Sequence, residues 1–220
     1  MSAAAGPARI RIDFVSDVVC PWCAIGLYSL EQAIARIGDA IAVDLHFQPF
    51  ELNPGMAREG EAIDAHLAHK YGITPDQIAE NQARLRERGA AVGVVFGPRT
   101  RIYNTFDAHR LLHAAALEGQ GRDRALKHAL LRAYFTDGAD ISSHGTLLAL
   151  AGEAGLDVAE ADALLQSDRH ADAVRAQEAF YHRNGIRSVP AVILNERHLV
   201  SGGQPPEVFE QALRQVAGLA

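Results

Sequence analysis

Residues 17–26 read DVVCPWCAIG and contain both cysteines of the chain, Cys20 and Cys23. Pro21 and Trp22, the one tryptophan of the sequence, stand between them. Two cysteines placed at random in a chain of 220 residues would be three positions apart about once in a hundred cases. The spacing therefore indicates a shared chemical role for the two thiols.

The flanking residues predict where this motif lies in the fold. Apolar and polar residues alternate over 9–15, as in a strand, and apolar positions recur at helical spacing over 21–37. Gly38 ends that helix, and the alternation returns over 41–50. A strand, a helix and a strand within about forty residues form a βαβ unit with parallel strands. The cysteine pair is thus predicted to lie where a strand gives way to a helix.

Helical patterns fill the middle of the chain. Residues 61–166 carry helical periodicity and include a capping box from Thr74 to Gln77. The pattern then changes to a helix over 168–184, a β-hairpin over 191–200 and a final helix. Without its helical middle, this order of elements is the thioredoxin topology.

We therefore predict an α/β protein with a thioredoxin fold interrupted by a large all-helical insertion domain. The first half of the thioredoxin-like domain is assigned to residues 1–54, of which 1–8 are expected to be a flexible tail. The insertion is assigned to residues 55–167 and the second half to 168–220.

The composition narrows the class of function. The formal net charge is −6 and 48% of the residues are hydrophobic, so the chain has no broad basic face and we expect no nucleic-acid partner. No apolar run approaches the ~20 residues that span a bilayer. The start of the chain lacks the basic and apolar regions of a signal peptide. We therefore expect a cytoplasmic protein without a membrane partner, in a compartment that keeps thiols reduced.

The predicted position of the cysteines suits redox chemistry. If the helix begins at Cys20, the unpaired N–H groups and the dipole of its first turn favour a thiolate there. We expect Cys20 to be the exposed, attacking sulfur and Cys23, nearly one turn later, to attack the mixed disulfide from inside. Pro21 fits the first turn because its missing N–H has no partner to lose there.

Two other interpretations of the pair are possible. A structural zinc ion needs about four cysteine or histidine ligands, and no histidine pair lies near the cysteines in the sequence. Two histidine pairs have helical spacing and are interpreted as solvated or interface residues: His66 with His69, and His109 with His113. Two inert buried thiols are the remaining alternative. We favour thiol chemistry and predict no metal site.

Pro190 is a second sign of the same fold. It follows Val189 and directly precedes a predicted strand, and a proline there marks a strand edge or a special loop. In a thioredoxin topology this is the position of the cis-proline loop that faces the two cysteines. We therefore expect a cis Val189–Pro190 bond beside Cys20.

These segments together resemble the FrnE branch of the DsbA-like oxidoreductases. The resemblance runs in order from about Ile10 to Ala217 and rests on SDVVCPWCAIG, QPFELNP, NTFDAHRLLHAA, RAYFTDGADIS, SVPAVILN and SGGQPPEVFEQAL. It implies that Cys20 is the nucleophile and Cys23 the resolving cysteine, with Pro21 and Trp22 supporting the site. It also implies that the backbone at Val189 and Pro190 holds a thiol-containing chain.

The same superfamily offers an alternative function. Kappa-class glutathione transferases and hydroxychromene-carboxylate isomerases share the fold and resemble this chain at Ser201–Gln204, where they bind glutathione. They typically carry serine at the first active-site position, whereas this chain keeps both cysteines. We therefore predict a thiol-disulfide oxidoreductase or isomerase whose redox-active disulfide serves in place of a bound cofactor.

The binding partners follow from that prediction. The substrate is a disulfide or thiol, of protein or small-molecule nature, and glutathione is left open as a co-substrate. Asn53, Asn104 and Ser201 are candidates to line the substrate cleft. A homodimer is also compatible with the resemblance, because many relatives associate.

Overall fold

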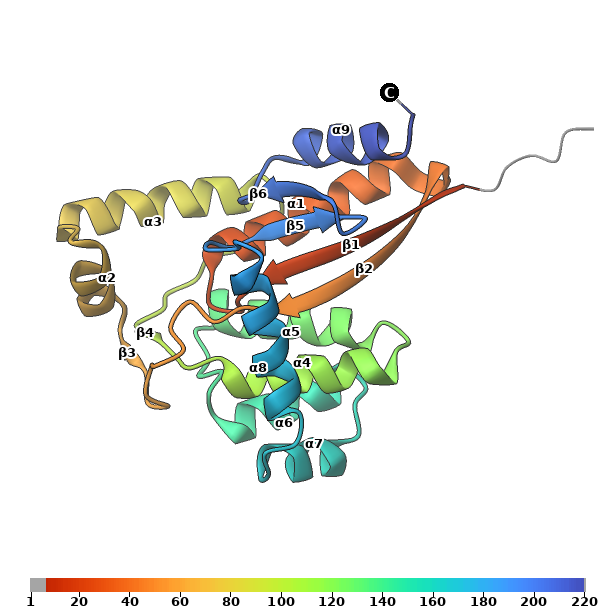
Figure 1. Ribbon diagram of the computed structural model, residues 1–220. Coiled ribbons are helices and arrows are strands. Elements are labelled where there is room, and N and C mark those ends of the chain that lie inside the picture. Colours follow the sequence, from red (N-terminus) through yellow and green to blue (C-terminus); the bar gives the residue numbers. More distant parts are fainter. Residues whose placement is uncertain (1–6, 220) are drawn as a thin grey trace, which may run out of the picture.

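A four-stranded sheet forms the centre of the protein in the computed structural model, which describes residues 7–219 (Figure 1). The strand order is β2-β1-β5-β6, and the strands are β1 (Ala8–Ser16), β2 (Ile41–Pro49), β5 (Ala191–Leu194) and β6 (His198–Ser201). β1 pairs with β2 in parallel and with β5 antiparallel, so that Phe14 lies between Phe47 and Val192. The predicted parallel unit and the predicted hairpin β5–β6 are both confirmed.

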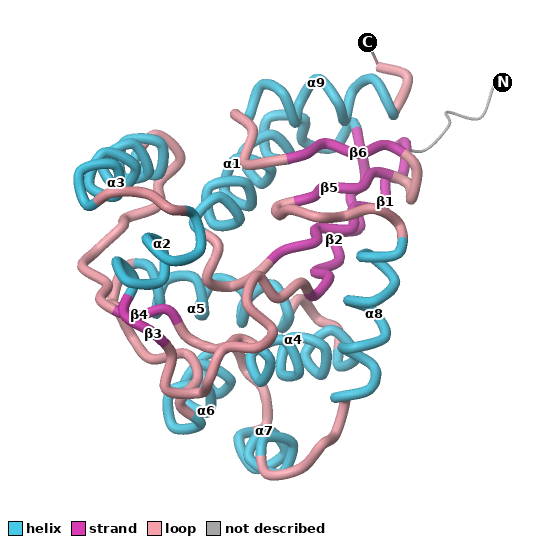
Figure 2. Tube along the Cα trace, turned by 60° about the vertical axis from the view of Figure 1, so that its left-hand side comes forward, coloured by secondary structure: helices cyan, strands magenta, loops and turns pink. Residues whose placement is uncertain are grey.

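Helices cover both faces of this sheet. Helix α1 (Pro21–Ile37) follows β1 and packs beside α9 (Pro206–Val216), while α8 (Ala171–Arg183) lies on the other side and contacts β2 (Figures 1 and 2). Gly38 ends α1 with a φ of 58°, and a short 3-10 turn (Gly38–Ala40) leads into β2. This arrangement is that of a thioredoxin fold.

The insertion between β2 and α8 is helical, as predicted. Its helices are α2 (Ile63–Tyr71), α3 (Pro75–Ala90), α4 (Phe106–Glu118), α5 (Arg122–Phe135), α6 (His144–Glu153) and α7 (Val158–Leu165). The predicted capping box is present at the start of α3, where Thr74 and Gln77 exchange hydrogen bonds. A ladder of two residues on each side, β3 (Glu61–Ala62) with β4 (Arg101–Ile102), is the part of the insertion that helical periodicity does not predict.

The insertion contacts the sheet domain in two ways. Helices α2 and α3 form an arm that extends to one side, and α3 also contacts α1 (Figures 1 and 2). Helices α4 and α5 pack against each other, and α4 contacts β2. One hydrophobic cluster contains Phe14 and Leu30 of the sheet domain together with Leu111 and Leu130 of the insertion. Helix α1 and the insertion therefore contribute side chains to one hydrophobic core.

Two boundaries differ from the sequence prediction. α8 begins at Ala171, not at residue 168, because His170 has a φ of 65° and cannot continue a helix. Ala8, which was assigned to the tail, is the first residue of β1. Residues 1–6 of the predicted flexible tail lie outside the described residues.

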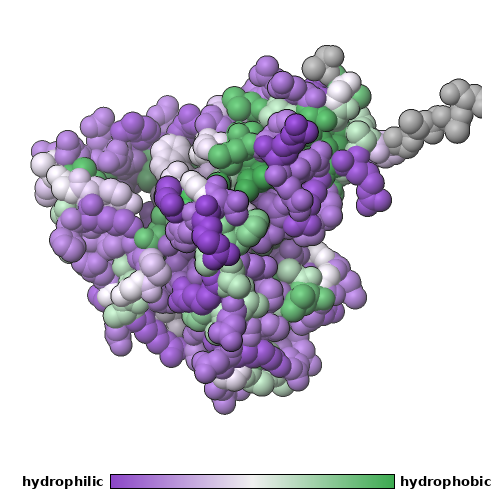
Figure 3. Space-filling view, in the orientation of Figure 1, coloured by the Kyte–Doolittle hydropathy of each residue, from purple (hydrophilic) through white to green (hydrophobic). Residues whose placement is uncertain are grey.

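The surface is mostly hydrophilic in the view of Figure 3, with apolar residues gathered near β6 and the start of α9. Leu199 of β6 and Val208 of α9 are among the exposed large apolar side chains. Within residues 7–219, none of the helices has the length and apolar character needed to cross a bilayer.

Candidate active site

Cys20 occupies the N-cap of α1. Its backbone is extended (φ −86°, ψ 114°), and its carbonyl accepts hydrogen bonds from the N–H groups of Cys23 (3.0 Å) and Ala24 (3.2 Å). Pro21 starts the helix, as predicted, and the Cys20 side chain makes no capping hydrogen bond. The thiol is therefore held at the positive end of the helix dipole, where an anion is favoured.

The environment of Cys20 is more closed than the sequence predicts. Only 4% of the residue is exposed, so the prediction of an exposed sulfur is wrong. The reason is the loop before β5: the Cys20 thiol donates to the carbonyl oxygen of Val189, with 3.6 Å between sulfur and oxygen. Any molecule that reacts with this sulfur must approach it beside the Val189 carbonyl.

Cys23 lies entirely inside the protein, on the first turn of α1. Burial, together with the hydrogen bond and charge of Cys20, raises the pKa of Cys23 well above its ordinary value, while the charge of Lys127 acts in the opposite direction. Both cysteines are reduced in this structure. Cys23 is thus a thiol that does not ionise readily by itself.

The loop before β5 and the loop after β6 close over the start of α1. The Val189–Pro190 bond is cis, which confirms the prediction, and the Pro190 carbonyl accepts from the N–H of Gly202 at 2.8 Å. A Cβ atom at Gly26 would lie 3.0 Å from the Pro190 side chain, and one at Gly203 would lie 2.7 Å from the carbonyl oxygen of Trp22. At Gly203 a side chain would require the backbone to shift, and at Gly26 the Pro190 ring would have to give way, so the three segments are tightly packed.

Asp17 lies three residues before Cys20, and its buried carboxylate contacts two other segments of the chain. One carboxylate oxygen accepts from the N–H of Leu52 at 2.7 Å, and the other lies 3.4 Å from the His109 ring on α4. Burial alone would raise the pKa of Asp17, but the hydrogen bond and charge of His109 and the Leu52 N–H lower it. His109 is only 2% exposed, so of its two interpretations, solvated or interface, the solvated one is wrong: it lies between α4 of the insertion and the Asp17 segment.

Lys127 of α5 is a buried ammonium group next to the same segment. Its residue is 1% exposed, and its Nζ donates to the Ser16 hydroxyl at 2.8 Å. Burial lowers the pKa of Lys127 to about 8, while the nearby charges of Cys23, Asp17 and Cys20 act to raise it. The insertion thus brings a titratable group close to the buried cysteine.

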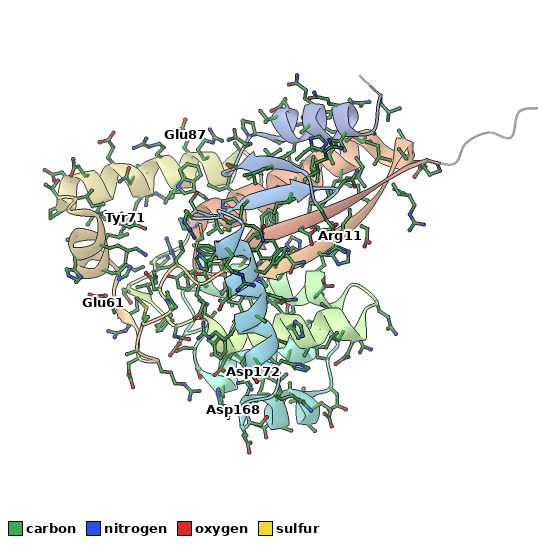
Figure 4. All side chains as sticks on the ribbon, in the orientation of Figure 1. Arg11, Glu61, Tyr71, Glu87, Asp168 and Asp172 are labelled. Carbon is green, nitrogen blue, oxygen red and sulfur yellow. The ribbon has the colours of Figure 1, made fainter. Side chains whose placement is uncertain are left out.

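The α2–α3 arm provides a rim beside the cysteines. Figure 4 shows Tyr71 at the α3 end of α2. The ring is largely exposed, and burial together with the charge of Cys20 raises the pKa of Tyr71, which places the phenol within electrostatic reach of the sulfur. Trp22, 37% exposed, presents a second aromatic surface from α1 itself. Trp22 and Tyr71 are thus two exposed aromatic rings in the neighbourhood of Cys20.

The three candidate cleft residues occupy different places. Asn53 lies in the loop after β2, where its side-chain oxygen accepts from Lys70 at 2.6 Å. The Asn104 side-chain oxygen accepts from the Phe106 N–H, and its NH₂ group donates to the Met56 carbonyl oxygen. Its side-chain amide is therefore bound to the backbone at two places. Ser201 is exposed at the end of β6. Of the three candidates, Asn53 is the one that contacts the α2–α3 arm, through Lys70. Asn104 caps the start of α4 and has a structural role.

The remaining histidine pair is divided by the fold. His66 is buried and bonds to Glu61 at 2.8 Å, so the interpretation of this residue as solvated is also wrong. His69, one turn later on α2, is exposed. Within residues 7–219, no group of three or more histidine, cysteine or carboxylate side chains is arranged to hold a metal ion.

The fold is that of a known family. Residues 11–214 match the model of the DSBA-like thioredoxin domain, and the chain belongs to this family. It is an oxidoreductase of the DsbA-like class.

Solved structures of similar proteins agree with this assignment. A probable DsbA oxidoreductase from Streptomyces coelicolor is 37% identical, with 96% of this chain and 91% of that chain covered and a TM-score of 0.89. The cytosolic disulfide reductase DsbM from Pseudomonas aeruginosa with GSH is 20% identical, covering 95% of this chain and 100% of that one, with a TM-score of 0.64. A 2-hydroxychromene-2-carboxylate isomerase is 17% identical, covering 96% and 99%, with a TM-score of 0.70. The latter two share the fold.

Proposed function

We propose that the protein catalyses thiol–disulfide exchange through Cys20 and Cys23. The observation that carries this proposal is the placement of the two sulfurs: Cys20 lies at the N-cap of α1 beside the Val189 carbonyl, and Cys23 is buried one turn behind it. The Val189 carbonyl beside Cys20 supplies a backbone acceptor that an extended substrate chain can use.

The exchange proceeds in two balanced steps. The Cys20 thiolate attacks a substrate disulfide, so that one sulfur of the substrate becomes bonded to Cys20 and the other leaves as a thiolate. Cys23 then gives up its proton and attacks the Cys20 sulfur, releasing the second substrate thiolate and leaving a Cys20–Cys23 disulfide. The substrate is reduced by two electrons, and the cysteine pair is oxidised by two. The reverse sequence oxidises a dithiol, and no bound cofactor is required.

A glutathione-dependent transferase or isomerase is the competing function. The fold shared with a hydroxychromene-carboxylate isomerase supports this alternative. Cys23 argues against it, because conjugation or isomerisation needs one activated thiol and not a second thiol behind the first. We therefore propose glutathione, or a small disulfide of similar size, as a reactant that exchanges with Cys20.

The proposal also covers substrate contacts around Cys20 and the cellular location of the protein. Trp22 and Tyr71 offer stacking surfaces, and Lys70 beside Asn53 offers a positive charge to a substrate carboxylate. A cytoplasmic location is proposed because a protein of the same fold is a cytosolic disulfide reductase.

Reduction of insulin by dithiothreitol tests the function. We expect the protein to shorten the lag before insulin precipitates, and Cys20→Ser to behave like buffer. A conjugation or isomerisation assay with glutathione is run on the same preparation. Activity in that assay, with no effect on insulin or on glutathione disulfide, would refute the proposal in favour of the alternative.

A further inference from the structure

A cavity of about 380 Å³ lies between α1, α5 and the loop that follows α3. Neither cysteine lines it, so it is separate from the candidate active site. Its lining includes four residues with little or no side chain, on both helices and on the loop: Ala24, Gly93, Ala125 and Ala129. Larger side chains at these positions would fill the space, as they do elsewhere in a well-packed interior. The cavity therefore exists because small residues face one another across it.

The larger apolar side chains around this cavity mark a recess that opens to solvent. Val94 and Leu131 are buried and line it, whereas Val95, which also lines it, is 64% exposed. A Cβ atom built on Gly93 would meet no other atom within 4 Å, so no protein atom fills the space beside this glycine. A concave, mainly apolar recess with a solvent opening is typical of a small-molecule site.

The charged side chains around the cavity already have partners. Arg132 donates to both carboxylate oxygens of Glu153, at 2.7 and 2.6 Å. The His128 ring lies 2.9 Å from a carboxylate oxygen of Glu31. A charged ligand would have to displace one of these partners, and an uncharged ligand would not. The lining therefore favours an uncharged molecule.

Tyr28 of α1 provides a hydrogen-bond donor at the same place. Its ring lines the cavity and lies edge-on to the His128 ring, with 5.1 Å between the ring centroids. Within residues 7–219 its hydroxyl has no hydrogen-bond partner, and burial together with the charge of Glu31 raises the pKa of Tyr28. The phenol thus keeps its proton and can donate it to an acceptor atom, while its ring offers an aromatic surface.

We propose that this cavity binds an uncharged molecule of two fused rings, at least one of them aromatic, whose carbonyl oxygen accepts from the Tyr28 hydroxyl. The volume sets the size of the ligand. An apolar cavity of about 150 Å³ holds one benzene ring. The observed cavity of about 380 Å³ therefore holds two rings. Binding here goes beyond the proposed thiol–disulfide exchange and does not depend on it.

Two uncharged compounds with the same skeleton test the proposal. 1-Indanone carries a carbonyl oxygen, and indane is the same pair of fused rings without it. Each is titrated into protein labelled with nitrogen-15, and the amide shifts give the location and the Kd. We expect saturable shifts at Gly93, Ala125 and Ala129, with tighter binding of 1-indanone. Tyr28→Phe should weaken 1-indanone about 5- to 10-fold and leave indane unchanged. Indane-2-carboxylate, the anionic analogue, should bind more weakly than 1-indanone.

Filling the cavity provides the matched control. Ala129→Leu adds a larger side chain to the lining, and we expect it to weaken both uncharged compounds about tenfold or more. Ala125→Leu, at an exposed position one turn earlier on α5, replaces it if Ala129→Leu does not fold. Ala159→Leu, exposed on α7 away from the cavity, should bind like the wild type.

Three results would overturn the proposal: shifts centred on the surroundings of Cys20, binding that survives the filling substitution, or tighter binding of the anion than of 1-indanone. Cys20→Ser should bind both uncharged compounds like the wild type, because neither cysteine lines the cavity. Loss of thiol–disulfide exchange and loss of this site are therefore measured separately.

Discussion

The start of α1 and the α4–α5 pair of the insertion serve the same two sulfurs by different routes. At the start of α1, neighbours in sequence build the site: Cys20, Pro21 and Cys23 are set by one helical turn. In the insertion, His109 and Lys127 reach the site from 92 and 111 residues beyond their partners Asp17 and Ser16. In the proposed mechanism the first region supplies the reacting atoms, and the second places charged groups around them.

The largest effect is expected from the local region. Cys20→Ser removes the sulfur that forms the mixed disulfide, and no other thiol in the chain can reach a substrate, because Cys23 is fully buried. We expect exchange with dithionitrobenzoate to fall by about three orders of magnitude or more, to the uncatalysed rate. Stopped-flow absorbance with dithionitrobenzoate measures this loss. Retention of even a tenth of the activity would show that Cys23 can attack directly.

Asp17→Ala tests the junction between the two regions. It leaves His109 and the Leu52 N–H buried without their partner, and we expect the free energy of unfolding to drop by about 3–5 kcal/mol. Urea denaturation at neutral pH gives the value. Asn104→Ala, which removes the side-chain acceptor of the Phe106 N–H at the start of α4, serves as the control and is expected to cost about 1 kcal/mol.

The same pair has a defined pH dependence. The pKa of Asp17 is lowered in the folded protein, so its stabilisation is present above the unfolded value of about 4 and is lost as the pH falls below it. The stability difference between wild type and Asp17→Ala should therefore shrink in acid. A difference that stays constant from neutral pH down to pH about 3 would show that Asp17 is not charged in the folded state.

Gly203→Ala probes the loop that closes over α1. Its new methyl group would lie 2.7 Å from the Trp22 carbonyl, so the loop or the helix start must shift. We expect a loss of about 1–3 kcal/mol in unfolding free energy. Gly145→Ala is the control, because the nearest atom to a Cβ there is 3.8 Å away. Equal thermal midpoints for the two variants would contradict the close packing of this loop against the active site.

The smallest effect concerns the arm. Tyr71→Ala removes an exposed ring near Cys20 without opening the core, so its consequence is confined to substrate contact. We expect KM for glutathione disulfide to rise about 2- to 5-fold with kcat nearly unchanged. Tyr71→Phe keeps the ring and should restore the wild-type KM. A fall in kcat with constant KM would mean that the phenol acts on the reacting sulfur instead.

The division between the two regions also explains what the sequence can predict. The cysteine spacing, the helix start and the proline before β5 are local patterns, and each predicts its own structure: the N-cap position of Cys20, the place of Pro21 and the cis Val189–Pro190 bond. The parallel pairing of β1 and β2 follows from the length of the connection. Those predictions need no knowledge of distant contacts.

Contacts across the insertion have no such local signature. His109 reads as a polar residue on an amphipathic helix, and only its meeting with Asp17 makes it a buried partner. Lys127 stands between Leu126 and His128, so its neighbours in the sequence give no clear sign of burial, and its partner Ser16 lies at the end of a strand far away in the chain. Likewise the closed environment of Cys20 depends on the Val189 carbonyl, 169 residues away.

The central claim is that Cys20 forms a mixed disulfide which Cys23 resolves, and one measurement tests it directly. Cys23→Ser and Cys20→Ser are each treated with glutathione disulfide, and the adducts are located by intact mass and peptide mapping. We predict one stable glutathione adduct on Cys20 in Cys23→Ser, no comparable adduct on Cys23 in Cys20→Ser, and an internal disulfide without adduct in the wild type. Failure of the Cys23→Ser adduct to accumulate, or its equal appearance in Cys20→Ser, would contradict the assigned roles.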